Sequence, residues 1–64
     1  MSLNDNLRRL IKENKLNITK ISKDTGVDRA TIHRLIAEEN ENPKINTVKA
    51  LANYFEITID ELIK

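Results

Sequence analysis

Two arginines and a histidine share one side of a short helical segment, residues 29–37. At about 100° per residue the outward side chains span an arc of roughly 140°, while Ile32, Leu35 and Ile36 lie on the other side. In the major groove of DNA, arginine can pair bidentately with guanine, and an alanine methyl can touch thymine. The pattern therefore favours a base-reading surface made of Arg29, Ala30, His33 and Arg34, beside the small Ala37.

The preceding residues supply a turn that can hold this segment in place. The stretch from Ile18 to Ala37 predicts two short helices broken by Gly26, the only glycine of the chain. Glycine enters a left-handed backbone without steric cost, and Ser22 is small enough for the point where the helices touch. Asp28 can cap the second helix. We expect the apolar contacts that lock the two helices to come from Ile21, Val27, Ile32 and Leu35.

This pair of helices is a candidate helix-turn-helix, and its outer surface has two interpretations. Together with the glycine turn, the arc favours a helix laid into the major groove. An ordinary amphipathic helix with a solvated polar face would show the same periodicity, and the sequence leaves that alternative open.

The length and composition of the chain predict a single small helical domain, residues 1–64. A chain of this length buries only about 60% of its unfolded surface, so we expect a compact core of marginal stability. Glycine and proline occur once each, and no run alternates apolar and polar residues for long, which predicts an all-α fold. Because cysteine is absent, disulfides and thiolate zinc sites are excluded.

Charge is divided unevenly along the chain. Residues 1–37 hold eight Lys or Arg against four acids and residues 38–64 hold three against six, so the parts carry +4 and −3. The basic part contains the candidate reading helix, as an electrostatic footprint on phosphate requires. Chance scatter of charge in a small domain is the alternative. No signal-peptide core or membrane-span length is seen, and we expect a cytoplasmic protein associated with the nucleoid.

Apolar spacing predicts the helices at the beginning of the chain. The first runs from about Leu3 to Asn14, with Ser2 as its cap. Asn17 caps the second helix, which ends near Thr25. The third covers about Arg29 to Ala37. The first helix should bury one stripe, made of Leu3, Leu7, Leu10 and Ile11.

The second half of the chain predicts a loop and two more helices. The polar segment Glu38 to Lys44 predicts the longest loop. A fourth helix should run from about Asn46, its cap, to Phe55, with Ile45 tucked into the core. Thr58 and Glu61 have the spacing of a capping box at the start of a last short helix.

Four local motifs accompany this order of helices: Ile21-Ser22, Gly26-Val27, Thr31-Ile32 and the ending Phe55 to Leu62. With them the chain resembles, from about Leu7 to Leu62, the DNA-binding domain of phage lambda-type repressors and Cro proteins, the XRE family. The resemblance implies a compact five-helix lambda repressor-like domain, with the helix-turn-helix at about residues 18–37. It also implies sequence-specific binding of double-stranded DNA by a transcriptional regulator, here expected to be a repressor. In this family the third helix enters the major groove, which implicates the same four residues: Arg29, Ala30, His33 and Arg34.

Contacts to phosphate are expected at four further residues. The N–H groups at the start of a helix favour an anion, which points to the region of Asn17. Thr31 can add a hydroxyl, and Lys44 and Asn46 match positions where the family's loop and fourth helix approach the DNA backbone. For Lys44 an exposed lysine without a specific role is the alternative.

Three positions depart from the family pattern. Ile18 stands where a glutamine often helps to hold a phosphate. Ser22 replaces the commoner alanine, and Thr25 replaces a larger apolar residue. We expect the last two replacements to keep the motif and to loosen its packing.

Other function classes find less support. His33 is the only histidine, and no cysteine or phosphate-cradling glycine loop is present, so we expect no enzyme, metal site, cofactor or small-molecule substrate. A protein-interaction module or an antitoxin-type component on the same scaffold is the alternative function, and Ile57 and Ile63 would then matter more than the third helix.

The family often binds two half-sites as a dimer, so the resemblance favours a palindromic operator and allows a homodimer. Tyr54, Ile57 and Ile63 are candidates for dimer contacts, and core packing explains them equally well. The chain can equally be a whole protein or the amino-terminal piece of a larger regulator.

Overall fold

The apolar stripes of the sequence form five helices in the computed structural model, which describes residues 3–37 and 43–64. In chain order they are α1 (Leu3–Glu13), α2 (Ile18–Thr25), α3 (Arg29–Ile36), α4 (Ile45–Tyr54) and α5 (Ile59–Ile63). These two ranges contain no strand, and the all-α fold with five helices is confirmed. Ser2, expected as the first cap, and residues 38–42 of the predicted loop lie outside the described residues.

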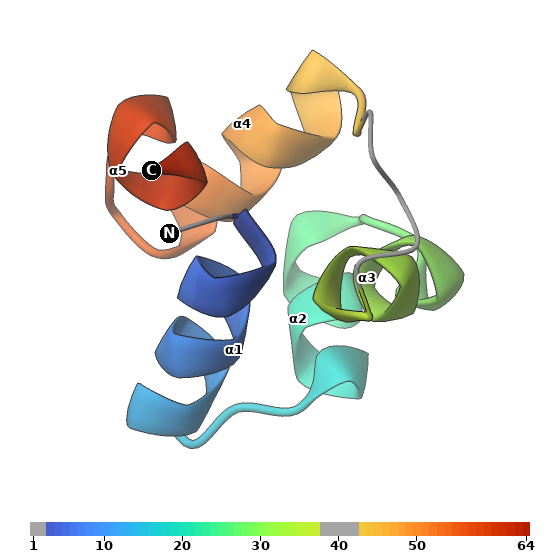
Figure 1. Ribbon diagram of the computed structural model, residues 1–64. Coiled ribbons are helices and arrows are strands. Elements are labelled where there is room, and N and C mark those ends of the chain that lie inside the picture. Colours follow the sequence, from blue (N-terminus) through green and yellow to red (C-terminus); the bar gives the residue numbers. More distant parts are fainter. Residues whose placement is uncertain (1–2, 38–42) are drawn as a thin grey trace.

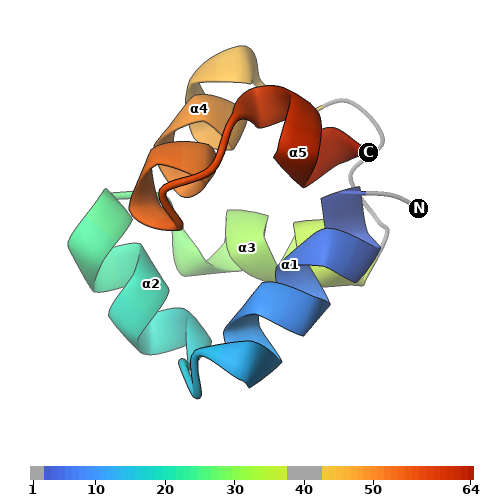
Figure 2. The ribbon, with the colours of Figure 1, turned by 90° about the vertical axis from the view of Figure 1, so that its left-hand side faces the viewer.

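The helices surround one core to which each of them contributes. α1, α2 and α3 form one part of the molecule, and α4 and α5 lie across it (Figures 1 and 2). α1 packs against α3 and α5, α2 packs against α3 and α4, and α4 packs against α5. Unfolding of any one helix would therefore expose apolar surface of its neighbours to water. The buried apolar residues are Leu7, Ile21, Ile32, Leu35, Val48, Leu51, Ala52 and Leu62.

Two of the expected caps are confirmed by their hydrogen bonds. The Asn17 side-chain oxygen accepts the Lys20 N–H at the start of α2, over 2.8 Å. At the start of α5, the Glu61 N–H donates to the Thr58 hydroxyl oxygen and the Thr58 N–H donates to the Glu61 carboxylate, over 3.1 and 3.2 Å. Each cap satisfies backbone donors that a helix start leaves free.

The expected cap of α4, Asn46, was wrong by two residues. Lys44 holds the N-cap position with an extended backbone, and its C=O accepts the N–H groups of Thr47 and Val48. Asn46 therefore lies inside the first turn and caps nothing. Ile45, expected in the core, is 64% exposed, because it lies at the tip of the helix, beyond the part that α2 and α5 cover.

Two helices end on residues with a left-handed backbone that are not glycine. Lys15 after α1 has φ 53° and Glu56 after α4 has φ 59°. In each case the next residue donates its N–H five positions back, from Leu16 to Ile11 and from Ile57 to Ala52. This is the Schellman arrangement, whose left-handed position usually carries glycine. The sequence placed both helix ends to within one residue, at Asn14 and Phe55, but it did not reveal their left-handed residues because no glycine marks them.

Candidate nucleic-acid interface

The turn between α2 and α3 determines how these helices meet. Gly26 has φ 78°, and its N–H donates to the Ser22 carbonyl over 2.9 Å. The predicted left-handed glycine is confirmed. A Cβ atom at this position would meet nothing within 4 Å, so the backbone conformation alone explains the glycine.

The hydroxyls of α2 fasten this turn. Ser22 donates to the Val27 carbonyl over 2.6 Å. Thr25 donates to the Ile21 carbonyl over 2.7 Å and accepts the Val27 N–H over 3.1 Å. The expectation of looser packing overlooked these bonds, which neither an alanine nor an apolar side chain could make.

α3 separates a buried face from an exposed one. Ile32 and Leu35 are 0% and 1% exposed, and together with Ile21 they form the expected lock against the other helices. Val27 and Ile36 are partly buried beside them. All four candidate base-reading residues are exposed on the same helix: Arg29, Ala30, His33 and Arg34.

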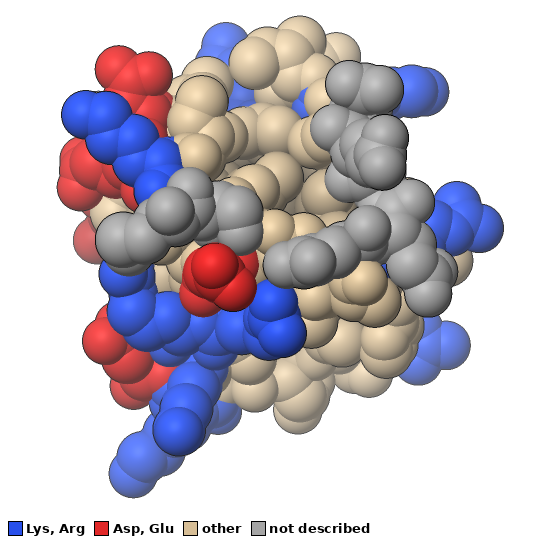
Figure 3. Space-filling view, viewed as in Figure 1, with Lys and Arg blue, Asp and Glu red and all other residues tan. Residues whose placement is uncertain are grey.

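The arginines of this face differ from the two arginines of α1 in forming no ion pair with a carboxylate of the described residues. Arg8 pairs with Asp5 and Arg9 with Glu13, whereas no carboxylate of the described residues lies at ion-pair distance from Arg29 or Arg34. Among the described residues, the right-hand half of Figure 3, over α2, α3 and the start of α4, shows Lys and Arg and no Asp or Glu. The acidic side chains coloured in this view gather on its left-hand side.

Asp28 occupies the N-cap position of α3, but its side chain makes no capping hydrogen bond, contrary to expectation. Its backbone has φ −59° and ψ 138°, and its carbonyl accepts the Ile32 N–H over 3.1 Å. The backbone thus starts the helix without help from the carboxylate.

The four candidate phosphate contacts lie on three helix starts. Asn17 precedes α2, the half-buried Thr31 is in the first turn of α3, and the exposed Lys44 and Asn46 are at the start of α4. Because the Asn17 side chain takes the Lys20 N–H, the N–H groups of Ile18 and Thr19 are the donors left at this end of α2. In Figure 1 the starts of α2 and α4 lie below and above α3 on the same side of the molecule.

A polar link that the sequence did not reveal joins α2 to α4. The Lys20 ammonium lies 3.0 Å from the Asp24 carboxylate, and the Tyr54 hydroxyl donates to that carboxylate over 3.0 Å. The hydrogen bonds from Lys20 and Tyr54 lower the pKa of Asp24 from its ordinary value. Partial burial and the bond to Asp24 raise the pKa of Tyr54, and Asp24 raises the pKa of Lys20.

The described residues offer no metal site and no membrane span. These residues contain no group of three His, Cys, Asp or Glu able to hold a metal ion. None of their helices is long and apolar enough to cross a membrane. A hollow of about 330 Å³ lies between the ends of α1 and α4, and none of the candidate DNA-contacting residues lines it; its walls are Asn14, Leu16, Tyr54, Phe55 and Glu56.

A sequence model of the Cro/C1-type HTH DNA-binding domain matches residues 6–64. The chain belongs to this family. Membership makes it a DNA-binding domain of the kind found in transcription regulators, in agreement with the resemblance noted from the sequence.

Relatives carry the same description. The chain is 39% identical over 62 residues to an uncharacterized HTH-type transcriptional regulator of Coxiella burnetii, covering 97% of this chain and 29% of that protein. It is 34% identical to a similarly described protein of Rickettsia prowazekii, covering 91% of this chain and 66% of that protein. The crystal structure of a transcriptional regulator from Listeria innocua superposes with a TM-score of 0.82 at 34% identity, over 95% of this chain and 56% of that one. The chain thus spans only part of each relative.

Proposed function

We propose that this domain represses transcription by binding an operator with α3 in the major groove. One observation carries the proposal: α3 is locked to the core by Ile32 and Leu35, while its outer face presents two arginines that pair with no carboxylate of the described residues. A helix held rigidly on one face and free for bonding on the other suits direct readout of bases. The base-reading residues of the proposal are Arg29, Ala30, His33 and Arg34.

In this proposal, residues at the starts of α2, α3 and α4 bind the phosphates of the DNA backbone. The free N–H groups after Asn17 offer donors to a phosphate, and the positive end of α2 favours an anion there. Thr31 contributes a hydroxyl, Lys44 a charge and Asn46 an amide at the edges of α3. Such contacts fix the register of the protein on DNA, whereas sequence is read by the outer face of α3.

Two copies of the domain, bound to the two halves of a palindromic operator, complete the proposal. Reading centres of two copies would lie about one helical repeat of DNA, about 34 Å, or a multiple of it apart. Ile63 of α5, 47% exposed, and the half-buried Ile57, which precedes α5, are the candidate contacts between copies.

Selection of bound duplexes from a random pool, followed by sequencing, tests this function. We expect an enriched motif with two-fold symmetry, and a reporter promoter carrying that motif should be repressed when the protein is expressed. Binding of all duplexes alike would contradict sequence-specific recognition. No binding to any duplex would favour the alternative of a protein-interaction module.

A further inference from the structure

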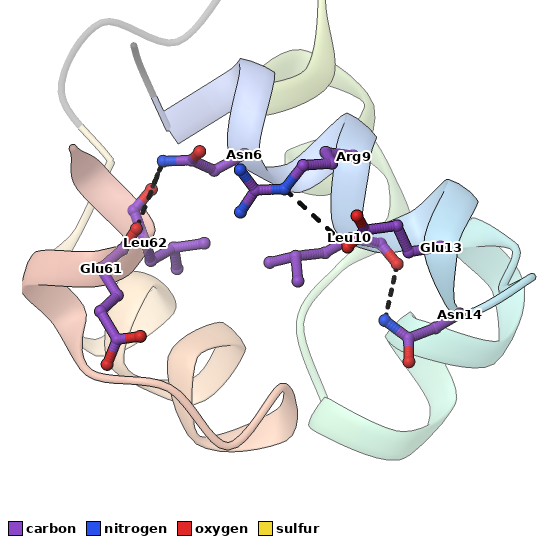
Figure 4. Close-up of polar contacts among 7 residues, drawn as sticks. All are labelled: Asn6, Arg9, Leu10, Glu13, Asn14, Glu61 and Leu62. Carbon is purple, nitrogen blue, oxygen red and sulfur yellow. Dashed lines mark hydrogen bonds and ion pairs between the residues drawn. The ribbon is translucent and has the colours of Figure 1, made fainter.

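Two asparagines in the first turns of α1 bind the carboxyl-terminal ends of other helices. Asn6 is 2% exposed, and its amide donates to the Leu62 carbonyl of α5 over 2.6 Å and lies 3.4 Å from the Glu61 carbonyl (Figure 4). Two positions earlier, the Asn4 amide donates to the Leu35 carbonyl of α3 over 3.0 Å. Because residues two apart point about 200° away from each other on a helix, each asparagine serves a different neighbour.

Both acceptors belong to the last turn of their helix, where carbonyls lack the partner that a continuing helix would give them. An amide from another helix then does two things at once. It satisfies the carbonyl, and it fixes the distance between the two helices. In α3 the carbonyl bound by Asn4 lies at the end of the helix opposite to the glycine turn.

The two ends of α3 are therefore held by different devices. At its start, the carbonyl and the N–H of Val27 bind Ser22 and Thr25 of α2. At its end, the Leu35 carbonyl binds Asn4 of α1. The eight residues of α3 span about 12 Å. A small rotation of α3 about the glycine turn therefore displaces side chains at its far end enough to lengthen or break their hydrogen bonds to DNA.

We propose that Asn4 is a positioning residue for DNA recognition, which sets the tilt of α3 and thereby the fit of its outer face in the groove. This inference rests on the function proposed above. Asn4 itself makes no contact with bases in this scheme. It acts through the Leu35 carbonyl, and its loss would leave the end of α3 held only by the apolar packing of Leu35 and its neighbours.

Asn4→Ala tests this role, and the chain offers a matched control. The Asn14 amide also donates to a helix carbonyl, over 2.8 Å, but that carbonyl belongs to Leu10 of α1, the helix that Asn14 directly follows (Figure 4). Asn14→Ala therefore removes a similar bond without touching α3. Alanine favours the helical state more than asparagine does, so α1 should survive the Asn4 change.

The readout is the ratio of affinities for the selected operator and for an unrelated duplex. Partial unfolding lowers both affinities by the same factor, so a loss of stability alone leaves the ratio unchanged. For Asn4→Ala we expect the ratio to fall about threefold to tenfold, the range that one hydrogen bond supports. Amide hydrogen exchange in the last turn of α3 should become faster in the free protein. Asn14→Ala should keep both the ratio and the exchange of α3 at wild-type values.

A ratio within twofold of wild type for Asn4→Ala, or unchanged exchange in α3, overturns the positioning role and leaves the proposed function intact. A wild-type protein that prefers no duplex instead refutes the proposed function, and the positioning role falls with it. The two failures are thus distinguished by the wild-type titration.

Discussion

Arg29 is the side chain whose removal best separates base reading from attachment. It lies in the first turn of α3, exposed and at ion-pair distance from no carboxylate of the described part of the chain. Arg29→Ala should cost about 1–3 kcal/mol on the selected operator and much less on unrelated DNA, the range for one bidentate base contact. Paired titrations on both duplexes, with circular dichroism as a folding check, measure this.

Lys44→Ala is the matched change at a residue assigned to phosphate. It should weaken both duplexes by similar factors, because a phosphate contact carries no sequence information. Equal losses on both duplexes for Arg29→Ala would show that Arg29 holds the backbone instead. The reading role would then pass to His33 or Arg34.

Gly26 is required by its backbone conformation and not by lack of space. Gly26→Val should destabilise the fold by about 1–3 kcal/mol, because a β-branched residue is strained at positive φ. Gly26→Asn should lose less, since asparagine tolerates the left-handed region. Urea unfolding of the three proteins checks the order, and an unchanged midpoint for the valine variant would contradict it.

At the end of α4, a substitution should raise the stability of the domain instead of lowering it. Glu56 has φ 59° in a position that glycine enters without strain. Glu56→Gly should stabilise the domain by about 0.5–1 kcal/mol, since relief of left-handed strain exceeds the added flexibility of the unfolded chain. Glu56→Ala removes the same carboxylate but keeps the strain, so thermal melts should show a gain for glycine alone. A similar gain for alanine would assign the effect to charge.

The link between α2 and α4 makes stability depend on pH. The pKa of Asp24 is lowered in the folded state by Lys20 and Tyr54, so its contribution is present above the ordinary carboxyl pKa, about 3.9. It is lost as the pH falls through the lowered value. Wild type should therefore exceed Asp24→Asn in stability near neutral pH, with the difference shrinking in acid.

Tyr54→Phe keeps the ring and removes one of the two bonds to Asp24, so the wild-type advantage over it should be smaller. Denaturant unfolding between pH 2 and 7 checks both variants. A difference between wild type and Asp24→Asn that does not change with pH would refute this electrostatic account.

The whole domain should bind DNA through an electrostatic face. If the side around α3 neutralises several phosphates, log affinity should fall with log salt by about 0.9 per phosphate, giving a slope of roughly −3 to −6 for one domain. Lys44→Ala should make the slope less steep by about one unit. Lys64→Ala, at the end of α5 and outside the proposed interface, should leave it unchanged. A flat salt response would exclude this mode of binding.

Local signals in the sequence were sufficient for the helices and for the outer face of α3. The spacing of Ile32 and Leu35 against Arg29 and His33 divides one helix into two faces, and burial follows that division. Gly26 marked the turn in the same way. Such features depend on residues within one or two turns of each other, which is why a linear pattern contains them.

Only the tertiary structure decided which polar groups meet across helices. Asn4 finds the Leu35 carbonyl 31 positions away, Asn6 finds Leu62 at 56, and Tyr54 finds Asp24 at 30. No local periodicity encodes these partners, because they depend on how whole helices cross. The exposure of Ile45 has the same origin, since its angular position suits the core but its place at the tip of α4 lies beyond it. Periodicity thus determined which side of each helix is buried, and packing decided how far along the helix that burial extends.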